Sequence, residues 1–540
     1  MVVYLVMEHI GKEEVGNMGY SQSDFSGGLN LFDSDAKLAD NEYCLASNIR
    51  IRTNDIVCAK DKEEDTTAPA GLKQGLYAFD NYLLLFCRGS AFYKDVALDT
   101  PWTQVNNFNM STEATRIFTE AVPASTLNFE RRLQEKNRAD GSSSETNLDV
   151  NPLIRTGPSL SGLVCQDGGT TQPYIIYPNA QAAIIREYNA WTKDFREYVP
   201  RGRQMKYMNG ILFVVSPDGK SLYRSVSGRP TDFVVNVNST GDKGGNADTT
   251  SYAVGYNPIT CLSALNSGEL FVGTAESCHP VEFNYERTIF AEPTFLNRRT
   301  FSAGIVNQFS FIDILSDYTF IDIDGLRSFN AVLQQQSEGR NSIFSSRVSR
   351  AFAGIKQTDL TSAAIVFDNY SFFAVNTIYG YRIGIYDNNR LVWVSFDNLG
   401  LDQPIKQFAI AKQSTNPTLY GITSDKVYKL YSSETNLQGD ITFKAATSGK
   451  AESRVKLQNV YVTYDGALAT SDAEIDQIVG NAETVNSAVR GVKEGTDTLR
   501  FNFTSRGRRT WKVKPRLRFQ SNASIPAISV LTEEITDLQQ

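Results

Sequence analysis

The sequence is poor in the residues that most often bind metals or act as nucleophiles. Its 540 residues include two histidines, His9 and His279, and six cysteines with no CxxC pair among them. Six cysteines in a chain of this length do not make a disulfide framework, and no histidine lies at zinc-ligand spacing from a cysteine pair. We expect no cofactor, and free thiols packed as small hydrophobic side chains in a reducing cytoplasm. The cysteines are Cys44, Cys58, Cys87, Cys165, Cys261 and Cys278.

Long apolar runs are also missing. No stretch approaches the roughly 18 apolar residues that cross a membrane, so we expect no membrane span. The N-terminal MVVYLVMEHIGKEE has no basic region before its apolar run and no small-residue cleavage site, so we do not interpret it as a signal peptide. A net charge of −7 argues against a generally basic surface that binds nucleic acid.

Motifs of enzymes are equally scarce. Residues 219–221 end like a phosphate-binding loop, but Val214 stands where that loop requires glycine. No GxSxG motif accompanies His279, and Ser216–Gly219 only partly matches the Asp-box of sialidases. Four aspartates surround one expected hairpin and fit either the paired carboxylates of a glycosidase or turn formation. They are Asp313, Asp317, Asp322 and Asp324. We expect no enzyme.

The sequence is rich in tyrosine (25) and phenylalanine (31), which favours sheets. The clearest unit is Met208–Val237. Its apolar run Ile211–Val215 predicts a strand buried on both faces. Pro217, Asp218 and Gly219 form a turn, a returning strand follows, and Phe233–Val237 is a further strand.

Looser copies of this unit recur along the chain, and from Met208 onward their period is about 50 residues. They lie near 73–102, 162–191, 259–283, 308–329, 363–396 and 405–431. Four-stranded units at roughly this period are typical of β-propeller blades, because radial packing covers the faces of each small sheet. A set of unrelated hairpins in a large sandwich is the alternative. The sequence predicts an all-β protein: a β-propeller of about seven blades, with six or eight also compatible.

The flanking segments predict an additional small β-domain and an inserted loop or helix segment. We divide the chain into an N-terminal arm (1–23), N-terminal strands and the first blade (24–110), an insertion (111–155), the remaining blades (156–440) and a C-terminal β-domain (441–540). A short helix is expected at Leu127–Lys136. In the last part we expect strands at 441–446, 455–464 and 525–530, a hairpin of 499–503 with 511–519, and a loop or short helix at 472–484. The alternative is that this C-terminal part closes the propeller ring together with N-terminal strands.

The most polarised stretch is 506–519, which has seven basic residues and no acidic one. They are Arg506, Arg508, Arg509, Lys512, Lys514, Arg516 and Arg518, here called the basic strip. On a strand, the last four share one face, opposite Trp511, Val513, Leu517 and Phe519, and Pro515 indicates an edge or a bulge. Two interpretations stay open. The strip faces a neighbouring subunit or nucleic acid, or it is the solvated face of an edge strand.

Several segments resemble a known family. DFSGGLN (24–30), NEYCLASNIRIR (41–52), the central 207–237, TTSYAVGYNPIT (249–260) and DGLRSF (324–329) are similar to the tail-hub proteins of short-tailed bacteriophages, also called nozzle or stabilisation proteins. The resemblance covers about 24–465, and its motifs are turns and strands rather than catalytic groups.

The resemblance implies a structural virion protein. Several copies, typically six, form a ring below the portal and adaptor, with tail fibres or other tail proteins beside or below it. The ring closes the DNA-filled capsid and forms part of the ejection channel, through which double-stranded DNA passes. The protein is then assembled in the host cytoplasm and located in the virion tail. A carbohydrate-binding or glycan-hydrolysing propeller, as a receptor-binding tail component, is the alternative, and a monomeric peptide-binding scaffold is a third.

Overall fold

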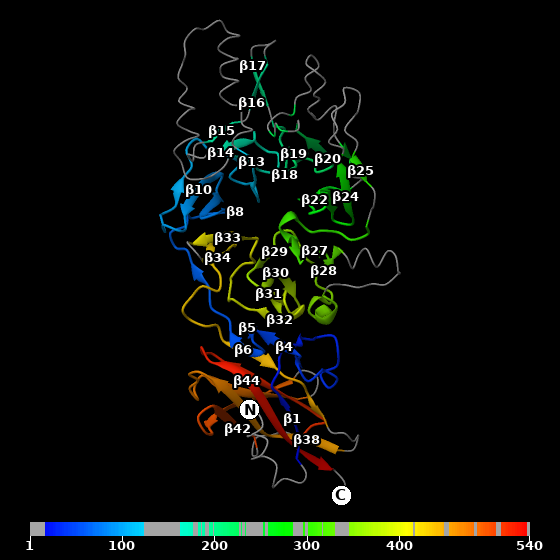
Figure 1. The fold of residues 1–540 in the computed structure, drawn as a ribbon, viewed down its shortest axis with the longest axis vertical. Helices are drawn as coiled ribbons and strands as arrows, with labels where there is room; N and C mark the ends of the chain where they lie inside the picture. The colour runs from blue at the N-terminus through cyan, green and yellow to red at the C-terminus, as the bar shows by residue number, and fades with distance from the viewer. Residues whose placement is uncertain are drawn as a thin grey trace.

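The computed structural model consists mainly of β-strands (Figure 1). It describes residues 17–123, 162–176, 182–184, 186–189, 194–197, 199–225, 228, 230, 233, 252–253, 257–283, 295–297, 301–315, 317–329, 345–413, 416–447, 453–479, 483–503 and 509–536. A group of small sheets occupies the upper part of Figure 1, and strands from the C-terminal part lie below them.

Seven small sheets of three or four strands follow one another along the chain and form a β-propeller. Blade 1 is β8 (Lys73–Phe79), β9 (Tyr82–Cys87), β10 (Ser90–Asp95) and β11 (Thr103–Gln104). Blade 2 is β12 (Phe118–Ala121), β13 (Leu163–Gln166), β14 (Tyr174–Ile176) and β15 (Ala182–Ile184), followed by a separate hairpin, β16 (Arg186–Asn189) and β17 (Asp194–Glu197). Blade 3 is β18 (Gln204–Met208), β19 (Ile211–Val215), β20 (Ser221–Arg224) and β21 (Tyr252–Ala253).

The other four blades complete the ring. Blade 4 is β22 (Ile259–Ala264), β23 (Leu270–Thr274), β24 (Cys278–Phe283) and β25 (Phe295–Asn297). Blade 5 is β26 (Phe311–Ile314), β27 (Asp317–Asp322) and β28 (Gly325–Ser328), with η3 (Gln308–Ser310) before it and η4 (Ser346–Phe352) after it. Blade 6 is β29 (Ala363–Phe367), β30 (Tyr370–Thr377), β31 (Gly380–Asp387) and β32 (Val392–Asp397). Blade 7 is β33 (Gln407–Gln413), β34 (Asn416–Ile422), β35 (Val427–Lys429) and β7 (Glu63–Glu64).

The predicted fold class is confirmed, and the seven sheets are consistent with the expected blade count. In blade 3, Ile211–Val215 is fully buried, as the apolar run indicated. Asn209 and Gly210 connect β18 to β19 with positive φ angles of 50° and 81°, the conformation that two-residue hairpin turns favour. First strands of neighbouring blades contact each other, for example β12 with β18 and β29 with β33. The ring is closed by β7, which comes from the N-terminal part and pairs with β35.

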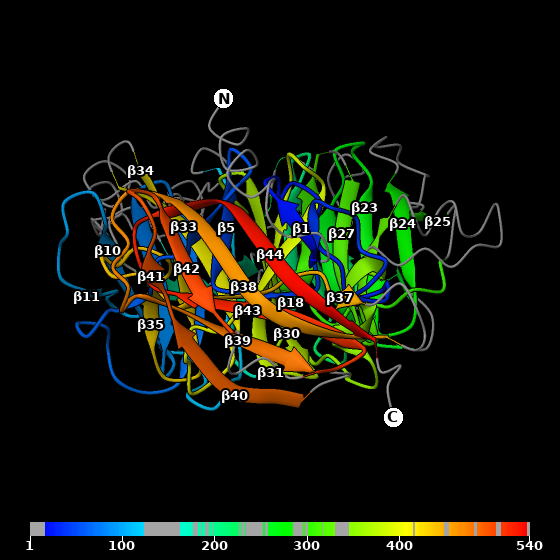
Figure 2. The same ribbon diagram turned by 90° about the horizontal axis from the view of Figure 1, so that it is seen from below.

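Two larger sheets form a second domain at the other end of the molecule. One contains β1 (Asn17–Gln22), β5 (Ile49–Arg52), β6 (Asp55–Cys58), β38 (Ser453–Asp465), β41 (Val492–Lys493), β42 (Thr498–Asn502) and β44 (Ser524–Thr536). The other contains β4 (Leu45–Ser47), β36 (Gly439–Thr442), β37 (Ala446–Thr447), β39 (Ala473–Val479), β40 (Glu483–Arg490) and β43 (Lys512–Phe519). A short parallel pair, β2 (Gly28–Leu29) and β3 (Glu42–Tyr43), lies beside them. Figure 2 shows the long strands β38 and β44 crossing this end diagonally.

Four local expectations are wrong. Residues 17–22 are not a free arm but pair with β44. The segment 111–155 is not wholly an insertion, because β12 lies inside it and is the first strand of blade 2. The polar 472–484 holds β39 rather than a loop or helix. Strands β42 and β43 lie in different sheets and form no hairpin.

Some expectations fall on residues that the structure does not describe. The helix at Leu127–Lys136 is one, and most of the strand at Phe233–Val237 is another. Phe233 itself is buried but lies outside any strand, and the fourth strand of blade 3 is β21. The C-terminal domain expected over 441–540 also includes β1 and β4 to β6 from the N-terminal part.

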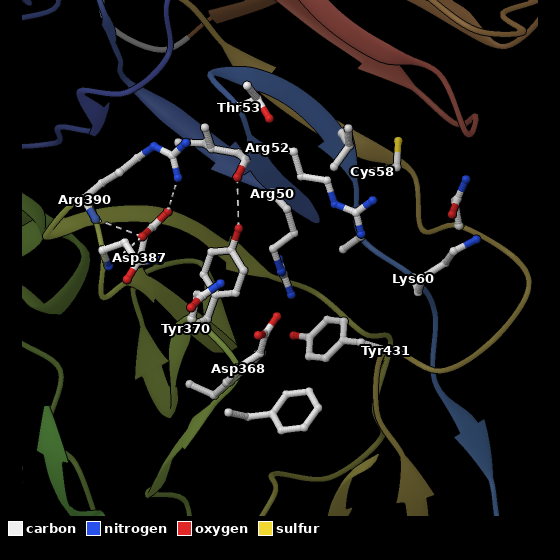
Figure 3. A pocket seen from close by; sticks show the side chains of 18 of the residues that line it. Arg50, Arg52, Thr53, Cys58, Lys60, Asp368, Tyr370, Asp387, Arg390 and Tyr431 are labelled. Atoms are coloured by element: carbon white, nitrogen blue, oxygen red, sulfur yellow. Dashed lines mark hydrogen bonds and ion pairs between the residues drawn. The ribbon is translucent and has the colours of Figure 1, made fainter. Parts of the chain in front are cut away.

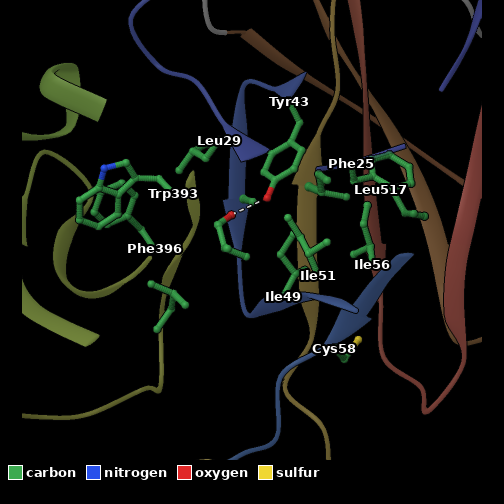
Figure 4. Close-up of a cluster of buried hydrophobic side chains, with 14 of the residues drawn as sticks. Phe25, Leu29, Tyr43, Ile49, Ile51, Ile56, Cys58, Trp393, Phe396 and Leu517 are labelled. Carbon is green, nitrogen blue, oxygen red and sulfur yellow. Dashed lines mark hydrogen bonds between the residues drawn. The ribbon is translucent and has the colours of Figure 1, made fainter. Parts of the chain in front are cut away.

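One hydrophobic core joins the two domains (Figure 4). Phe25, Leu29 and Tyr43 come from the N-terminal segment and pack between blade 6 and the two-sheet domain. Trp393 of blade 6 and Leu517 of β43 belong to the same buried cluster. Because the core is continuous, the domains pack as one unit rather than as two bodies on a linker.

Candidate functional site

The last four residues of the basic strip, Lys512, Lys514, Arg516 and Arg518, lie on β43, in the interior of its sheet. Strand β36 pairs with one side of β43 and β39 with the other, so the expected edge position is wrong. The alternation is confirmed for Val513, Leu517 and Phe519, which are fully buried, whereas Trp511 is 56% exposed. Pro515 is tolerated because the pairing partner on one side is interrupted between β36 and β37, opposite the proline.

Each of the four cations on β43 is paired with an acidic side chain of the same chain. The Nζ atoms of Lys512 and Lys514 lie 2.6 and 3.0 Å from Asp35 Oδ2. The guanidinium of Arg516 donates two hydrogen bonds to Asp440. Arg518 Nη2 lies 2.8 Å from Asp476 Oδ2 and 2.9 Å from Glu474 Oε1. We call this arrangement the charge ladder. Its cations are Lys512, Lys514, Arg516 and Arg518, and its acids are Asp35, Asp440, Glu474 and Asp476.

The charge ladder has no excess positive charge. Burial alone would raise the pKa of Asp35, but hydrogen bonds from Lys512 and Lys514 lower it below the ordinary value. The hydrogen bond to Asp440 raises the pKa of Arg516. Phosphate groups or an acidic partner would therefore have to displace acids that already hold these cations. Arg506 and Arg508 lie outside the described residues, and Arg509 is exposed.

The strongest polar cluster lies instead at the junction of the two domains, where sequence patterns indicated only a half-buried strand. Arg50 of β5 forms an ion pair of 2.7 Å with Asp397 of β32, and its guanidinium lies 4.5 Å from the ring centre of Tyr431. Asp397 Oδ1 also accepts hydrogen bonds from the backbone amide of Asn48 (2.7 Å) and from Ser395 Oγ (2.6 Å). Tyr431 donates its hydroxyl proton to Asp397 Oδ2 at 2.9 Å.

The electrostatics of this cluster follow from its burial. The Asp397 side chain is 0% exposed and that of Arg50 is 11% exposed. Burial alone would lower the pKa of Arg50, but the charge of Asp397, the hydrogen bond to it and the rings of Tyr431 and Tyr370 together outweigh burial and raise the pKa above the ordinary value. Burial, followed by the charge of Asp397, raises the pKa of Tyr431 well above its ordinary value. Arg50 is therefore held as a permanent cation that connects the domains.

A polar cavity of about 520 Å³ opens beside this cluster (Figure 3). Arg50 projects between the rings of Tyr370 and Tyr431, and Arg52 and Lys60 stand on the side of β5 and β6. The Tyr370 hydroxyl donates to the carbonyl oxygen of Ile51 at 3.0 Å, a further bond across the junction. These contacts serve to hold the two domains together.

The remaining candidate residues take structural positions. Asp322 pairs with Arg327 and Asp324 with Lys356, while Asp313 accepts from Asn266 Nδ2 at 2.7 Å and Asp317 from Ser328 Oγ. Four carboxylates thus bind four different neighbours, as turn and strand-end residues do. His279 is 7% exposed on β24, with its Nε2 2.8 Å from Ser277 Oγ, and burial lowers its pKa. His9 lies outside the described residues.

The six cysteines are all buried and free, which confirms their packing role. Burial raises the pKa of the Cys44 thiol to about 12. Residues 216–220 form the turn between β19 and β20, where Lys220 N donates to Asp218 Oδ1 at 3.0 Å. Across the described ranges, no group of three or more His, Cys, Asp or Glu is arranged to hold a metal ion. No described helix is long and apolar enough to cross a membrane.

Comparison with known proteins finds likeness of fold only. A chain of the mitotic checkpoint complex is similar over 69% of this chain and 96% of that chain, with 8% identity and a TM-score of 0.37. A chain of the S. cerevisiae complex of a Dbp5 variant with Nup159, a Gle1 variant, IP6 and ADP is similar over 72% of this chain and 98% of that chain, with 9% identity and a TM-score of 0.32. No family model and no curated protein matches the chain. The chain is a β-propeller protein with an added two-sheet β-domain.

Proposed function

We propose that this chain is a structural, non-enzymatic subunit of an oligomeric ring, of the tail-hub or nozzle type found in short-tailed bacteriophages. Its partners are further copies of itself, typically six, a portal or adaptor above, and tail fibres or other tail proteins beside or below. The ring closes a DNA-filled capsid and forms part of the ejection channel.

The observation that carries the proposal is the location of the residues behind the family resemblance. Residues 24–30 and 41–52 build the junction between the propeller and the two-sheet domain. Tyr43 donates its hydroxyl proton to the carbonyl oxygen of Val394 at 2.8 Å, and Gly28 approaches the backbone of Trp393. A likeness in these residues is therefore a likeness in how two domains are joined, which supports a shared architecture.

The electrostatics suit passage of DNA. The chain carries a net charge of −7, and the acids of the charge ladder neutralise its four cations. A wall that attracted phosphate strongly would retain the DNA, since each cation–phosphate contact adds to the affinity. The rigid junction gives each subunit a fixed shape, which a ring of identical copies needs for closure.

Measuring the mass of the purified assembly by native mass spectrometry and light scattering tests the proposal. We expect a species near six or twelve times the 60.0 kDa of one chain. A chain that stays monomeric at micromolar concentration contradicts the ring. A monomer that also hydrolyses a cell-surface glycan establishes the alternative, a carbohydrate-active propeller.

A further inference from the structure

Loops from five successive blades surround a second cavity, of about 380 Å³. Arg116 lies before blade 2, Gln204 starts blade 3, Ala275 lies in a turn of blade 4, Ile323 in a turn of blade 5, and Asp359 before blade 6. Segments from five blades in sequence meet at one place only around the propeller axis. Small-molecule sites are clefts of roughly 300–1,000 Å³, so this axial pocket lies at the small end of that range.

Arg116 is the notable side chain of the axial pocket. It is 9% exposed, and its Nη2 donates to the backbone carbonyls of Asp359 and Lys406. Its Nε and Nη1 are buried and have no hydrogen-bond partner among the residues that the structure describes. The guanidinium lies 4.8 Å from the ring centre of Phe309, which attracts the charge but supplies no acceptor. Buried donors without acceptors are costly, and a buried cation without an anion more so.

A second buried cation stands next to it. Lys406 is 5% exposed, and its Nζ donates to the carbonyl oxygens of Lys73 (3.1 Å) and Thr115 (3.2 Å). Burial, followed by the charge of Arg116, lowers the pKa of Lys406 to about 8. Burial also lowers the pKa of Arg116, to about 10. Among the described residues, neither cation forms an ion pair, although Asp359 is near enough to influence both pKa values.

The wall of the axial pocket carries charged side chains of both signs. Arg116 and Arg203 are balanced by Asp167 and Asp359, so the wall itself has no net charge. Lys406, protonated at pH 7, adds one positive charge beside it. One excess charge suits a monoanion better than a dianion, which the two aspartates would repel.

A hydrogen-bond acceptor in the same wall is also unsatisfied. Gln204 donates through Nε2 to the carbonyl oxygen of Thr260 at 2.7 Å, while no donor from the described part of the chain reaches its buried Oε1. Two residues of the pocket wall therefore hold unsatisfied groups, the donors of Arg116 and the acceptor of Gln204, which an oxyanion and a hydroxyl group would satisfy. A carboxylate without hydroxyl groups would satisfy the donors of Arg116 and leave the acceptor of Gln204 unpaired.

We propose that the axial pocket binds a small hydroxylated monocarboxylate, of the size and chemistry of a sugar acid. The carboxylate faces Arg116, with Lys406 behind it, and hydroxyl groups face Gln204. This site is independent of ring formation and goes beyond the structural role proposed above.

Isothermal titration calorimetry of the full chain at pH 7 with D-glucuronate, D-glucose and inorganic phosphate tests the proposal. We expect glucuronate to bind at least tenfold more tightly than either of the other two. Absence of glucuronate binding overturns the proposal. If glucose binds as tightly as glucuronate, the cations do not contribute to binding and the proposal is wrong. If phosphate binds as tightly as glucuronate, the pocket does not prefer a hydroxylated monocarboxylate and the proposal is also wrong.

Two variants and a control tie the binding to the pocket. Arg116→Gln and Lys406→Met should each weaken glucuronate binding at least tenfold. Lys406→Met removes a buried charge, so it should bind less while unfolding at a higher temperature, which a damaged fold would not do. Lys220→Met, an exposed lysine in a turn of blade 3, should change neither quantity. Unchanged glucuronate binding in both pocket variants overturns the proposal. The mass of the assembly is measured separately, so failure of the ring and failure of the pocket are distinguishable.

Discussion

Replacing Asp397 by asparagine should destabilise the junction strongly, because the substitution keeps the shape but removes the charge. The carboxylate is 0% exposed and lies 2.7 Å from Arg50. Removing one partner of a buried ion pair leaves the other charge uncompensated, which costs about 3–5 kcal/mol. Asparagine still accepts hydrogen bonds, so we expect the free energy of unfolding to fall by about 3 kcal/mol.

Urea unfolding followed by tryptophan fluorescence measures this, since Trp393 is buried on β32, the strand that also carries Asp397. Asp324→Asn is the matched control. Its partner is Lys356, and both side chains are more than half exposed, so the loss should stay below about 0.5 kcal/mol.

The double variant Arg50→Met with Asp397→Asn separates charge from packing. Removing both charges should cost less than removing Asp397 alone, because no unpaired ion remains. A loss below about 1 kcal/mol in Asp397→Asn, or a double variant whose cost equals the sum of the single ones, would refute the reasoning.

Three further predictions concern separate parts of the molecule. Gly28→Ala should cost more than about 2 kcal/mol, because φ is 71° and a Cβ atom would overlap the carbonyl oxygen of Trp393. Gly354→Ala, at φ 73° with no described atom within 4 Å of the added Cβ, should cost about 1 kcal/mol in thermal or urea unfolding. Lys406 faces Arg116, Asp359 and the backbone of Lys73. Its pKa is about 8 in the folded chain, against an ordinary value of 10.5. Between pH 8 and pH 10.5 the unfolded state therefore binds more protons than the folded state. The stability of the natural chain relative to Lys406→Met should therefore rise by roughly 3 kcal/mol from pH 8 to pH 10.5, and a flat difference would contradict the burial of a charged lysine. Arg516→Glu should lower the free energy of unfolding by about 1–3 kcal/mol by placing two acids together, and the exchanged pair Asp440→Arg with Arg516→Glu should restore it. If the exchanged chain folds and still forms rings of native mass, the charge ladder is not a subunit interface.

The repeated blades could be predicted well because each is a local unit. In blade 6 the pattern predicts strands at 363–367, 370–375, 380–386 and 391–396. Four of their eight ends coincide with the observed ones, and the other four differ by one or two residues. Strand period and turn residues lie within about 35 residues there, so the pattern and the fold agree.

The two-sheet domain is harder to predict from the sequence, because its strands pair with partners that are distant in the chain. Strand β39 carries Glu474 and Asp476 on its ladder face and looks polar, yet Ala473 and Ile475 are buried. β39 pairs with β43 and β40, and this pairing covers its side chains. The local sequence of β39 does not indicate these partners. The hairpin of 499–503 with 511–519 failed because consecutive strands in a two-sheet domain often belong to different sheets.

The candidate sites show the same limit. The basic strip was visible as seven cations, but the acids that neutralise it are distant in sequence, with Asp35 lying 479 residues from Lys514. Arg50 and Arg52 alternate with Ile49 and Ile51, which predicts their two faces correctly but not that Asp397 meets Arg50. The axial pocket draws on five blades, so none of its segments shows the site by itself.

The path of the N-terminal segment limits how the proposed ring can open. Between residues 17 and 64 the chain pairs with β44, packs on blade 6, enters both sheets of the second domain and then closes blade 7. Separating the blades would pull β7 from β35, and moving the second domain would break the Arg50–Asp397 pair. Moving the second domain would also disrupt the core that joins the two domains, and separating the blades would expose the clusters buried between them. Within the proposed function, the rearrangement that releases DNA therefore takes place between rigid copies of the chain, at contacts weaker than the junction inside each copy.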